Sequence, residues 1–131
     1  MAPTLQHILC VDDEPDILEV AQLSLEAVGG FQVTCLGSGV EAVAKAASIK
    51  PDLILLDVMM PGLDGPSTLQ ALRKIPELAH VPIVFMTARV QPAEVKKYLE
   101  IGAIAVTAKP FDAMALASDI TKTWERFHGQ S

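Results

Sequence analysis

The sequence predicts an α/β protein in which a parallel β-sheet carries helices on both faces. Short apolar runs alternate five times with longer segments whose apolar residues recur every three or four positions, and this alternation is typical of repeated strand–helix units. A chain of 131 residues fits one domain, and 50% hydrophobic with 20% charged residues is the composition of a globular protein. We therefore expect a single domain over residues 1–131, with an ordered core at about 5–128.

The five apolar runs are the expected strands, at residues 7–12, 31–36, 53–57, 81–87 and 103–108. Cys10 and Cys35 lie inside the first two of these runs, without a Cys-x-x-Cys spacing. We interpret both as small buried side chains, because free cysteine is among the most buried residue types.

Helices are expected between and after the strands, at about 15–28, 39–48, 66–75, 92–101 and 112–127. Pro15 stands in the first turn of the first helix, and Gly29-Gly30 follows its end. The last helix has one apolar stripe, which predicts core packing, formed by Ala113, Leu116, Ala117, Ile120, Trp124 and Phe127. Five strands alternating with five helices match the doubly wound order 2-1-3-4-5 of flavodoxin-like folds.

Acidic side chains close two of these strands. Asp12 and Asp13 follow the first strand, and Asp57 ends the third. In the predicted order these strands are neighbours, so we expect the three carboxylates to converge at the carboxyl edge of the sheet. Such carboxylates repel each other by roughly 4 kcal/mol per pair at about 4 Å, so either a proton or a cation must relieve the repulsion. Oxygen ligands alone favour Mg²⁺, with Mn²⁺ as a substitute, whereas Asp12 and Asp13 alone would fit helix capping equally well.

Two further polar residues end the remaining strands. Thr87 closes the fourth strand and Lys109 the fifth. Alone, such a threonine usually caps a turn and such a lysine usually points to water. Beside three acids, Lys109 and a divalent metal would offset the negative charge, and the site could then accept an anion such as phosphate, with Thr87 offering a hydrogen bond.

Four segments of the chain, in this order, resemble the receiver domains of bacterial two-component response regulators, and in particular the single receivers of chemotaxis. The segments are the acid pair after Ile8-Leu9-Cys10-Val11, then Asp57-Val58-Met59-Met60-Pro61-Gly62-Leu63-Asp64-Gly65, Met86-Thr87-Ala88 and Lys109-Pro110-Phe111. The resemblance spans essentially the whole chain, and as a set these motifs are highly specific.

The resemblance implies that Asp57 accepts a phosphoryl group from the phosphohistidine of a sensor kinase, so that the chain is a signalling phosphoacceptor and not an enzyme. It implies that Asp12 (partly through water), Asp13, Asp57 and the main-chain carbonyl of Met59 hold Mg²⁺. It further implies that Thr87 and Lys109 contact the phosphoryl oxygens, and that the peptide bond between Lys109 and Pro110 is cis.

The chain departs from the family pattern at Val106, three residues before Lys109, where receivers commonly carry an aromatic switch residue. We expect Thr87 still to move on phosphorylation, and the face formed by the fourth helix, fifth strand and fifth helix to respond less or differently. Met59 and Arg89 flank the site and are expected to alter the lifetime of the phosphorylated state, in a direction that the sequence does not decide.

The first helix has more apolar positions than one buried stripe requires, namely Ile17, Leu18, Val20, Ala21, Leu23, Leu25 and Val28. Receivers often bind a kinase's helical hairpin at this helix. A sensor histidine kinase or a histidine phosphotransfer domain is therefore the expected partner, with Ile17 and Val20 as the predicted docking residues.

Several other functions are disfavoured. A net charge of -6 with scattered basic residues argues against nucleic-acid binding. No apolar stretch approaches the roughly 20 residues of a membrane span and no signal peptide is evident, so we expect a cytoplasmic protein. The chain ends soon after the fifth expected helix, so we expect no output domain; a stand-alone receiver and a receiver excised from a longer regulator both fit the sequence. A dehalogenase-type phosphatase would need an acid where Met59 stands, and in a flavodoxin Asp13 and Glu14 would repel the phosphate. A receiver-like scaffold that is never phosphorylated is the remaining alternative.

Overall fold

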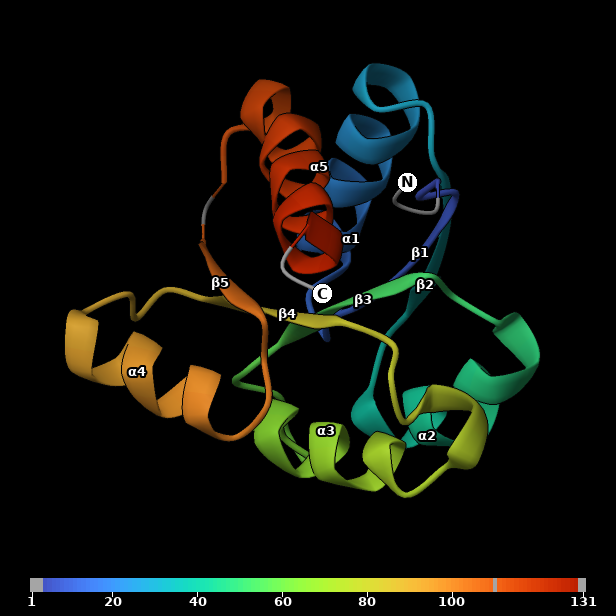
Figure 1. Ribbon diagram of the computed structural model, residues 1–131, viewed down its shortest axis with the longest axis vertical. Coiled ribbons are helices and arrows are strands. Elements are labelled where there is room, and N and C mark those ends of the chain that lie inside the picture. Colours follow the sequence, from blue (N-terminus) through green and yellow to red (C-terminus); the bar gives the residue numbers. More distant parts are fainter. Residues whose placement is uncertain (1–3, 110, 130–131) are drawn as a thin grey trace.

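The computed structural model describes residues 4–109 and 111–129, and it forms one five-stranded parallel sheet (Figure 1). The strands lie in the order β2-β1-β3-β4-β5, which confirms the predicted doubly wound topology. Their bounds are β1 His7–Val11, β2 Gln32–Leu36, β3 Leu53–Asp57, β4 Ile83–Thr87 and β5 Ala105–Ala108. The expected cis peptide at Pro110 lies outside the described residues.

Two strands begin two residues later than the sequence predicts. Pro82 precedes β4 and has no N–H to donate, so the main-chain pairing can use only its carbonyl, which accepts a hydrogen bond from the Ile54 N–H at 3.0 Å. Before β5, Gly102 turns the chain with a φ of 124°, and the ladder to β4 is established from the Ile104 N–H onward. The polar strand ends are unaffected by these differences.

The helices alternate with the strands as predicted, with bounds α1 Pro15–Leu23, α2 Gly39–Ile49, α3 Gly65–Arg73, α4 Pro92–Glu100 and α5 Ala113–Gly129. A short 3₁₀ turn, η2, covers Pro76–Leu78. The expected helix at 15–28 is divided, because α1 continues as a π-helical turn, η1, at Ser24–Val28. In η1 the Gly29 N–H reaches back five residues to the Ser24 carbonyl, and the buried Ser24 hydroxyl donates to the Ala113 carbonyl at the start of α5.

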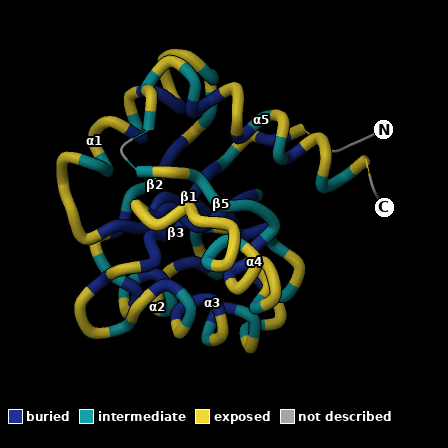
Figure 2. The backbone as a smooth tube through the Cα atoms, turned by 90° about the vertical axis from the view of Figure 1, so that its left-hand side faces the viewer, coloured by how far each residue is buried: buried dark blue, intermediate teal, exposed yellow. Residues whose placement is uncertain are grey.

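The sheet separates two apolar cores (Figure 2). Helices α2, α3 and α4 cover one face, whereas α1 and α5 cover the other. Strand β3 is buried along its whole length, as expected for a central parallel strand covered on both sides. The predicted stripe of α5 is confirmed at its centre, where Leu116, Ala117, Ile120 and Trp124 are buried. Cys10 is buried as predicted, but Cys35 on the edge strand β2 is only partly buried.

Among residues 4–109 and 111–129, no helix is long and apolar enough to cross a membrane.

Candidate functional site

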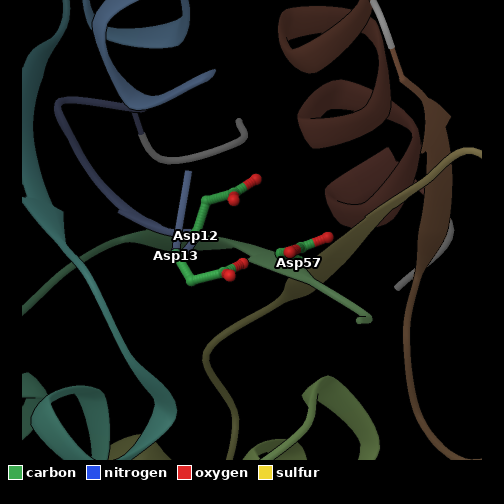
Figure 3. Close-up of side chains that lie close together, drawn as sticks. All are labelled: Asp12, Asp13 and Asp57. Atoms are coloured by element: carbon green, nitrogen blue, oxygen red, sulfur yellow. The ribbon is translucent and has the colours of Figure 1, made fainter. Parts of the chain in front are cut away.

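The pairing of β1 with β3 brings the acidic residues together. Val11 and Leu56 are registered partners on these neighbouring strands, so the residues that follow them, Asp12 and Asp57, lie side by side at the carboxyl edge. Carboxylate oxygens of Asp12, Asp13 and Asp57 all lie within 4.8 Å of one another. Figure 3 shows the carboxylates of the two adjacent acids reaching from the end of β1 toward the space beside Asp57. Asp12 and Asp57 are buried, whereas Asp13 is exposed.

Lys109 supplies the positive charge of this cluster. Its Nζ lies 2.9 Å from Asp12 Oδ2 and 3.1 Å from Asp57 Oδ1, and its side chain is 11% exposed. The strand end is held in place by a main-chain hydrogen bond from the Lys109 N–H to the Thr87 carbonyl. The predicted lysine therefore points into the site and not to water.

The electrostatics of the site leave one acid partly protonated near neutral pH. Burial, followed by the negative charge of Asp12, raises the pKa of Asp57 to about 6, although Lys109 opposes this rise. Burial acts to lower the pKa of Lys109, but its hydrogen bonds to Asp12 and Asp57 outweigh that effect and raise the pKa above its ordinary value. The ammonium of Lys109 therefore offsets only part of the negative charge of Asp12 and Asp57.

The helix-capping interpretation is not borne out, because the N-cap residue of α1 is Glu14, without a side-chain capping hydrogen bond, and Asp12 lies in the turn before it. Asp12 Oδ1 accepts a hydrogen bond from the Glu14 N–H at 2.9 Å at the start of α1, while its Oδ2 accepts one from Lys109. The same carboxylate therefore orders the entry to the helix and takes part in the charged cluster.

Thr87 also makes the local contact expected of a strand-end threonine. Its Oγ1 accepts a hydrogen bond from the Arg89 N–H at 3.0 Å, which closes the turn after β4. The residue is buried and lines the same cavity as Asp57 and Lys109.

A cavity of about 340 Å³ opens over the cluster. Its lining combines the predicted site residues with apolar side chains, and consists of Glu14, Ile17, Asp57, Met59, Thr87, Ala88 and Lys109. Met59 is 65% exposed at its rim, and Arg89 is exposed in the loop that follows. The site is therefore a shallow opening at the surface with a buried acidic floor.

Three lining residues, Glu14, Ile17 and Ala88, were not predicted as part of the site. Glu14 Oε1 lies 3.7 Å from Lys109 Nζ, which adds a fourth, exposed acid to the cluster. Its position directly after Asp12 and Asp13 was a signal that could have identified it. Ile17 lies one turn into α1 and was predicted as a docking residue, but its position in the cavity places it beside the acids.

The loop after β3 is held by a close approach of α3. The Gly65 N–H donates to the Val58 carbonyl at 2.9 Å, and a Cβ on Gly65 would lie 2.5 Å from the Asp57 carbonyl oxygen. Asp64 caps the helix by accepting from the Ser67 N–H at 2.9 Å. Glycine is required at position 65 because the helix starts against the main chain of Asp57.

The donor set fits a hard divalent cation. The three clustered side chains all offer carboxylate oxygens, and Asp57 Oδ2 is buried without a hydrogen-bond partner among the described residues. An unpartnered buried oxygen beside two further carboxylates is the arrangement that a bound Mg²⁺ would satisfy. Asp12, Asp13 and Asp57 are the side chains that could hold it.

The family model for the response regulator receiver domain matches residues 8–121 of this chain. The chain belongs to the response regulator receiver family. A receiver is a signalling phosphoacceptor rather than a catalytic enzyme, and the acidic triad found here is typical of the Mg²⁺ site of receivers. Membership of this family also removes the dehalogenase-type and flavodoxin alternatives.

Curated relatives of this receiver include transcriptional regulators. It is 39% identical over 121 residues to the transcriptional regulatory protein CseB of Streptomyces coelicolor, covering 92% of this chain and 50% of that protein. It is 36% identical over 115 residues to the DNA-binding response regulator MtrA of Mycolicibacterium smegmatis, covering 88% of this chain and 49% of the relative. The receiver thus spans about half the length of the curated relatives it matches.

Solved structures agree with the fold. The chemotaxis protein CheY4 of Vibrio cholerae superposes with a TM-score of 0.84 at 28% identity, covering 92% of this chain and 99% of that one. The receiver domain of a signal transduction histidine kinase from Syntrophus aciditrophicus superposes with a TM-score of 0.78 at 33% identity, covering 92% and 91%. This receiver therefore resembles both single receivers and receivers found within larger proteins.

Proposed function

We propose that this receiver accepts a phosphoryl group on Asp57 in a two-component or phosphorelay pathway. The observation that supports it most strongly is the state of the Asp57 carboxylate. Oδ1 is paired with the Lys109 ammonium, while the buried Oδ2 has no partner among the described residues. A buried carboxylate that is oriented by an ion pair and lines an open cavity is suited to act as a nucleophile.

The reaction requires alignment and charge neutralisation more than acid–base chemistry. An Asp57 oxygen would bond to phosphorus while the bond from phosphorus to the donor's histidine nitrogen breaks, leaving the electron pair on that nitrogen. Lys109, already 3.1 Å from Asp57 Oδ1, would offset charge on a phosphoryl oxygen. Thr87 lines the same cavity and would donate its hydroxyl hydrogen to another phosphoryl oxygen.

Mg²⁺, with Mn²⁺ as a substitute, is the proposed cofactor. Its ligands would be the carboxylates of Asp12 (partly through water), Asp13 and Asp57, together with the main-chain carbonyl of Met59. When bound, the ion would offset the charge of the phosphoryl oxygens and relieve the repulsion among the acids. This assignment rests on the clustering of the three carboxylates and on the unpaired Asp57 oxygen.

Receiver domains interact with histidine kinases. We propose that a sensor histidine kinase or a histidine phosphotransfer domain docks on α1, using Ile17 and Val20. Val20 is 38% exposed, and Leu23 on the same helix is 65% exposed, so α1 presents apolar surface to solvent. Ile17 lines the cavity, which would place the docked partner next to Asp57.

Val20→Ser is the cleaner test of docking, because Ile17 adjoins the reacting groups. We expect it to slow phosphotransfer from a phosphorylated histidine phosphotransfer domain and to leave labelling by acetyl phosphate unchanged. Val40→Ser, at a 65% exposed valine on α2, is the matched control and should change neither rate. Equal losses with both phosphodonors would exclude a docking role for Val20.

We further propose that residues 5–128 act as one receiver domain. The cytoplasmic location stays a prediction.

Mg²⁺-dependent labelling with acetyl phosphate tests the central proposal. Intact mass should show the gain of one phosphoryl group in the wild type, and this label should be lost in alkali, as expected for an acyl phosphate. Asp57→Asn should abolish the label, whereas Asp119→Asn, at an exposed aspartate on α5, should retain it. An acid-stable label that persists in Asp57→Asn would contradict the assignment. A wild type that takes no label with Mg²⁺ present would favour a scaffold that is never phosphorylated.

A further inference from the structure

The two cysteines of this chain face each other across neighbouring strands. Cys10 on β1 and Cys35 on β2 are registered partners, and both pack in the core covered by α1 and α5. Partners on adjacent strands lie about 4.7–4.9 Å apart, within the roughly 4.4–6.8 Å between the Cα atoms of disulfide-bonded cysteines. The strand pairing therefore holds the two thiols at a separation that a disulfide can span.

The thiols differ in access to solvent. Cys10 is fully buried on the inner strand, while Cys35 is partly buried on β2, which is an edge strand of the sheet. Cys35 Sγ lies 3.9 Å from the Leu18 carbonyl oxygen and 3.8 Å from Gln22 Oε1, both on α1. Of the two thiols, Cys35 is therefore the one that retains some access to a small oxidant, whereas Cys10 is closed to it.

The immediate surroundings favour reaction at Cys35. The hydrogen bond from the Cys10 thiol lowers the pKa of Cys35, and this effect exceeds the opposing effects of burial and of the nearby Glu26 charge. A thiolate is the reactive form of cysteine toward peroxides.

We propose that Cys10 and Cys35 form a reversible redox site, in which a peroxide converts the pair to an intramolecular disulfide. The Cys35 thiolate attacks one peroxide oxygen, the O–O bond breaks, and hydroxide leaves and takes up a proton to become water. Cys35 is then a sulfenic acid. The Cys10 sulfur attacks the Cys35 sulfur, the S–O bond breaks, and the hydroxyl leaves as water with the Cys10 proton. Two thiols lose two electrons in total, and one peroxide yields two waters.

This disulfide should be easily reduced. Main-chain pairing fixes β1 and β2 on either side of the bond, so the sulfurs must adapt to strands that cannot move apart or rotate freely. Disulfides that depart from relaxed geometry, and those near the surface, are more readily reduced. A bond between these two residues is therefore suited to a reversible modification and not to a permanent crosslink.

Intact mass tests the proposal directly, because the chain has only two cysteines and an intramolecular disulfide must join them. The folded protein is treated with hydrogen peroxide at low protein concentration. It is then denatured in the presence of an alkylating reagent, and its intact mass is measured by mass spectrometry without prior reduction. We expect a monomer that has lost two hydrogen atoms and takes up no alkyl group. Dithiothreitol should restore two alkylatable thiols.

A matched variant exchanges the residues of β2, combining Thr34→Cys with Cys35→Thr. Successive strand residues point to opposite faces, so the moved thiol would face away from Cys10 with the composition unchanged. We expect disulfide formation in the folded variant to be slower by on the order of tenfold or more, because the thiols are no longer held together. In denaturant both chains should oxidise alike, and circular dichroism verifies that the variant is folded.

Three results would overturn the proposal. The first is equal rates in the two folded chains. The second is a wild-type Cys35 that gains oxygen while Cys10 remains alkylatable. The third is a wild type that forms only disulfide-linked dimers.

Discussion

When no cation is bound, the ionised carboxylate of Asp57 lowers the free energy of unfolding. Its carboxylate is 2% exposed, and burial with the neighbouring Asp12 charge raises its pKa from 3.8 to about 6. An acid with a raised pKa in the folded state binds more protons when folded than when unfolded. Its contribution to stability is therefore fully present below pH 3.8 and is lost as the pH rises to about 6.

Replacing Asp57 with Asn should stabilise the metal-free protein at pH 7. A pKa difference of this size corresponds to about 3 kcal/mol, which the neutral amide would recover in large part. The gain in free energy of unfolding should shrink as the pH is lowered toward 4, where wild-type Asp57 is largely protonated. Urea unfolding at pH 7 and at pH 4 measures the free energy of unfolding of both proteins. Asp119→Asn is the control, and its free energy of unfolding should differ little from that of the wild type. A gain that is the same at both pH values would show that the charge of Asp57 is not its origin.

Unlike Asp57, Lys109 should stabilise the metal-free fold, because its ammonium offsets the charge of acids that are already buried. Lys109→Met keeps the length of the side chain but leaves Asp12 and Asp57 without their cation. We expect a loss of about 3 kcal/mol in the metal-free protein, as for other buried pairs that lose one partner. Mg²⁺ should bind more tightly to this variant, since the ammonium no longer repels it.

Chemical denaturation with and without Mg²⁺ measures both effects of this change. Lys45→Met is the control, because Lys45 pairs with Glu41 on the exposed face of α2, where such a pair contributes about 0.5 kcal/mol or less. A loss in Lys109→Met no larger than that of the control would show that Lys109 does not neutralise the acids.

At the scale of secondary-structure elements, the start of α3 fixes the main chain that follows β3. A Cβ at Gly65 would lie 2.5 Å from the Asp57 carbonyl oxygen and 2.7 Å from the Val58 Cα, distances that real structures do not show. Neither neighbour is the flexible end of a side chain. The helix and the loop must therefore separate if any other residue stands at position 65.

Gly65→Ala should consequently destabilise the fold by roughly 1–3 kcal/mol, the usual cost of forcing an extra carbon into a packed region. It should also slow labelling of Asp57 by acetyl phosphate, because the loop beside the carboxylate moves. Thermal unfolding and labelling rates test the two effects. Gly129→Ala is the control, since a Cβ there meets no atom within 4 Å. If Gly65→Ala were destabilised but labelled at the normal rate, the packing of α3 would have no influence on the reactivity of Asp57.

Val106 is the residue from which we expect a weaker or different response of the second half of the sheet. It is partly buried on β5 opposite Phe85, and it packs against the core that includes Tyr98 of α4. Valine is β-branched and has few rotamers, so it cannot make the large inward rotation of an aromatic ring.

Nuclear magnetic resonance spectra with and without beryllofluoride, a phosphoryl mimic, test this expectation at three positions. We expect Val95 on α4, Val106 on β5 and Trp124 on α5 to respond unequally, with small shifts at one or more of them. Large and matched shifts at all three would contradict it and would indicate that the face moves as one unit without an aromatic switch.

The sequence predicted the elements and the meeting of the three acids, because both follow from local patterns and from the expected strand order. Apolar runs identify the strands, and the expected neighbouring of the first and third strands places Asp12 and Asp57 at one edge, as the pairing of Val11 with Leu56 confirms. The π-helical turn, the close approach at Gly65 and the pairing of Cys10 with Cys35 depend on tertiary packing and on strand register. A one-residue change in register would have turned either cysteine to the other face of the sheet, so no local pattern could predict their contact.

At the scale of the whole molecule, the acidic cluster couples cation binding to the stability of the entire fold. A ligand that binds only the folded state stabilises it by about 2.7 kcal/mol at a concentration of 100 times its Kd. Mg²⁺ at such a concentration should therefore raise the melting temperature of the wild type. The increase in melting temperature caused by Mg²⁺ should be much smaller in Asp57→Asn. Calorimetry measures both increases, with KCl added to the Mg²⁺-free samples so that the ionic strength is constant. Equal increments in both proteins would indicate cation binding elsewhere on a chain of net charge -6.

Lys109 joins two parts of the sheet that have no strand pairing with each other. It follows β5 at the edge, yet its ammonium extends past β4 to acids carried by β3 and by the end of β1. We expect a change of charge in the middle of the protein to act on the outermost strand through this side chain. The main chain of β5, at the unpaired edge of the sheet, would then be the first to change its hydrogen-exchange rates when the charge at Asp57 changes. The exchange of its amide protons would report an event that occurs two strands away.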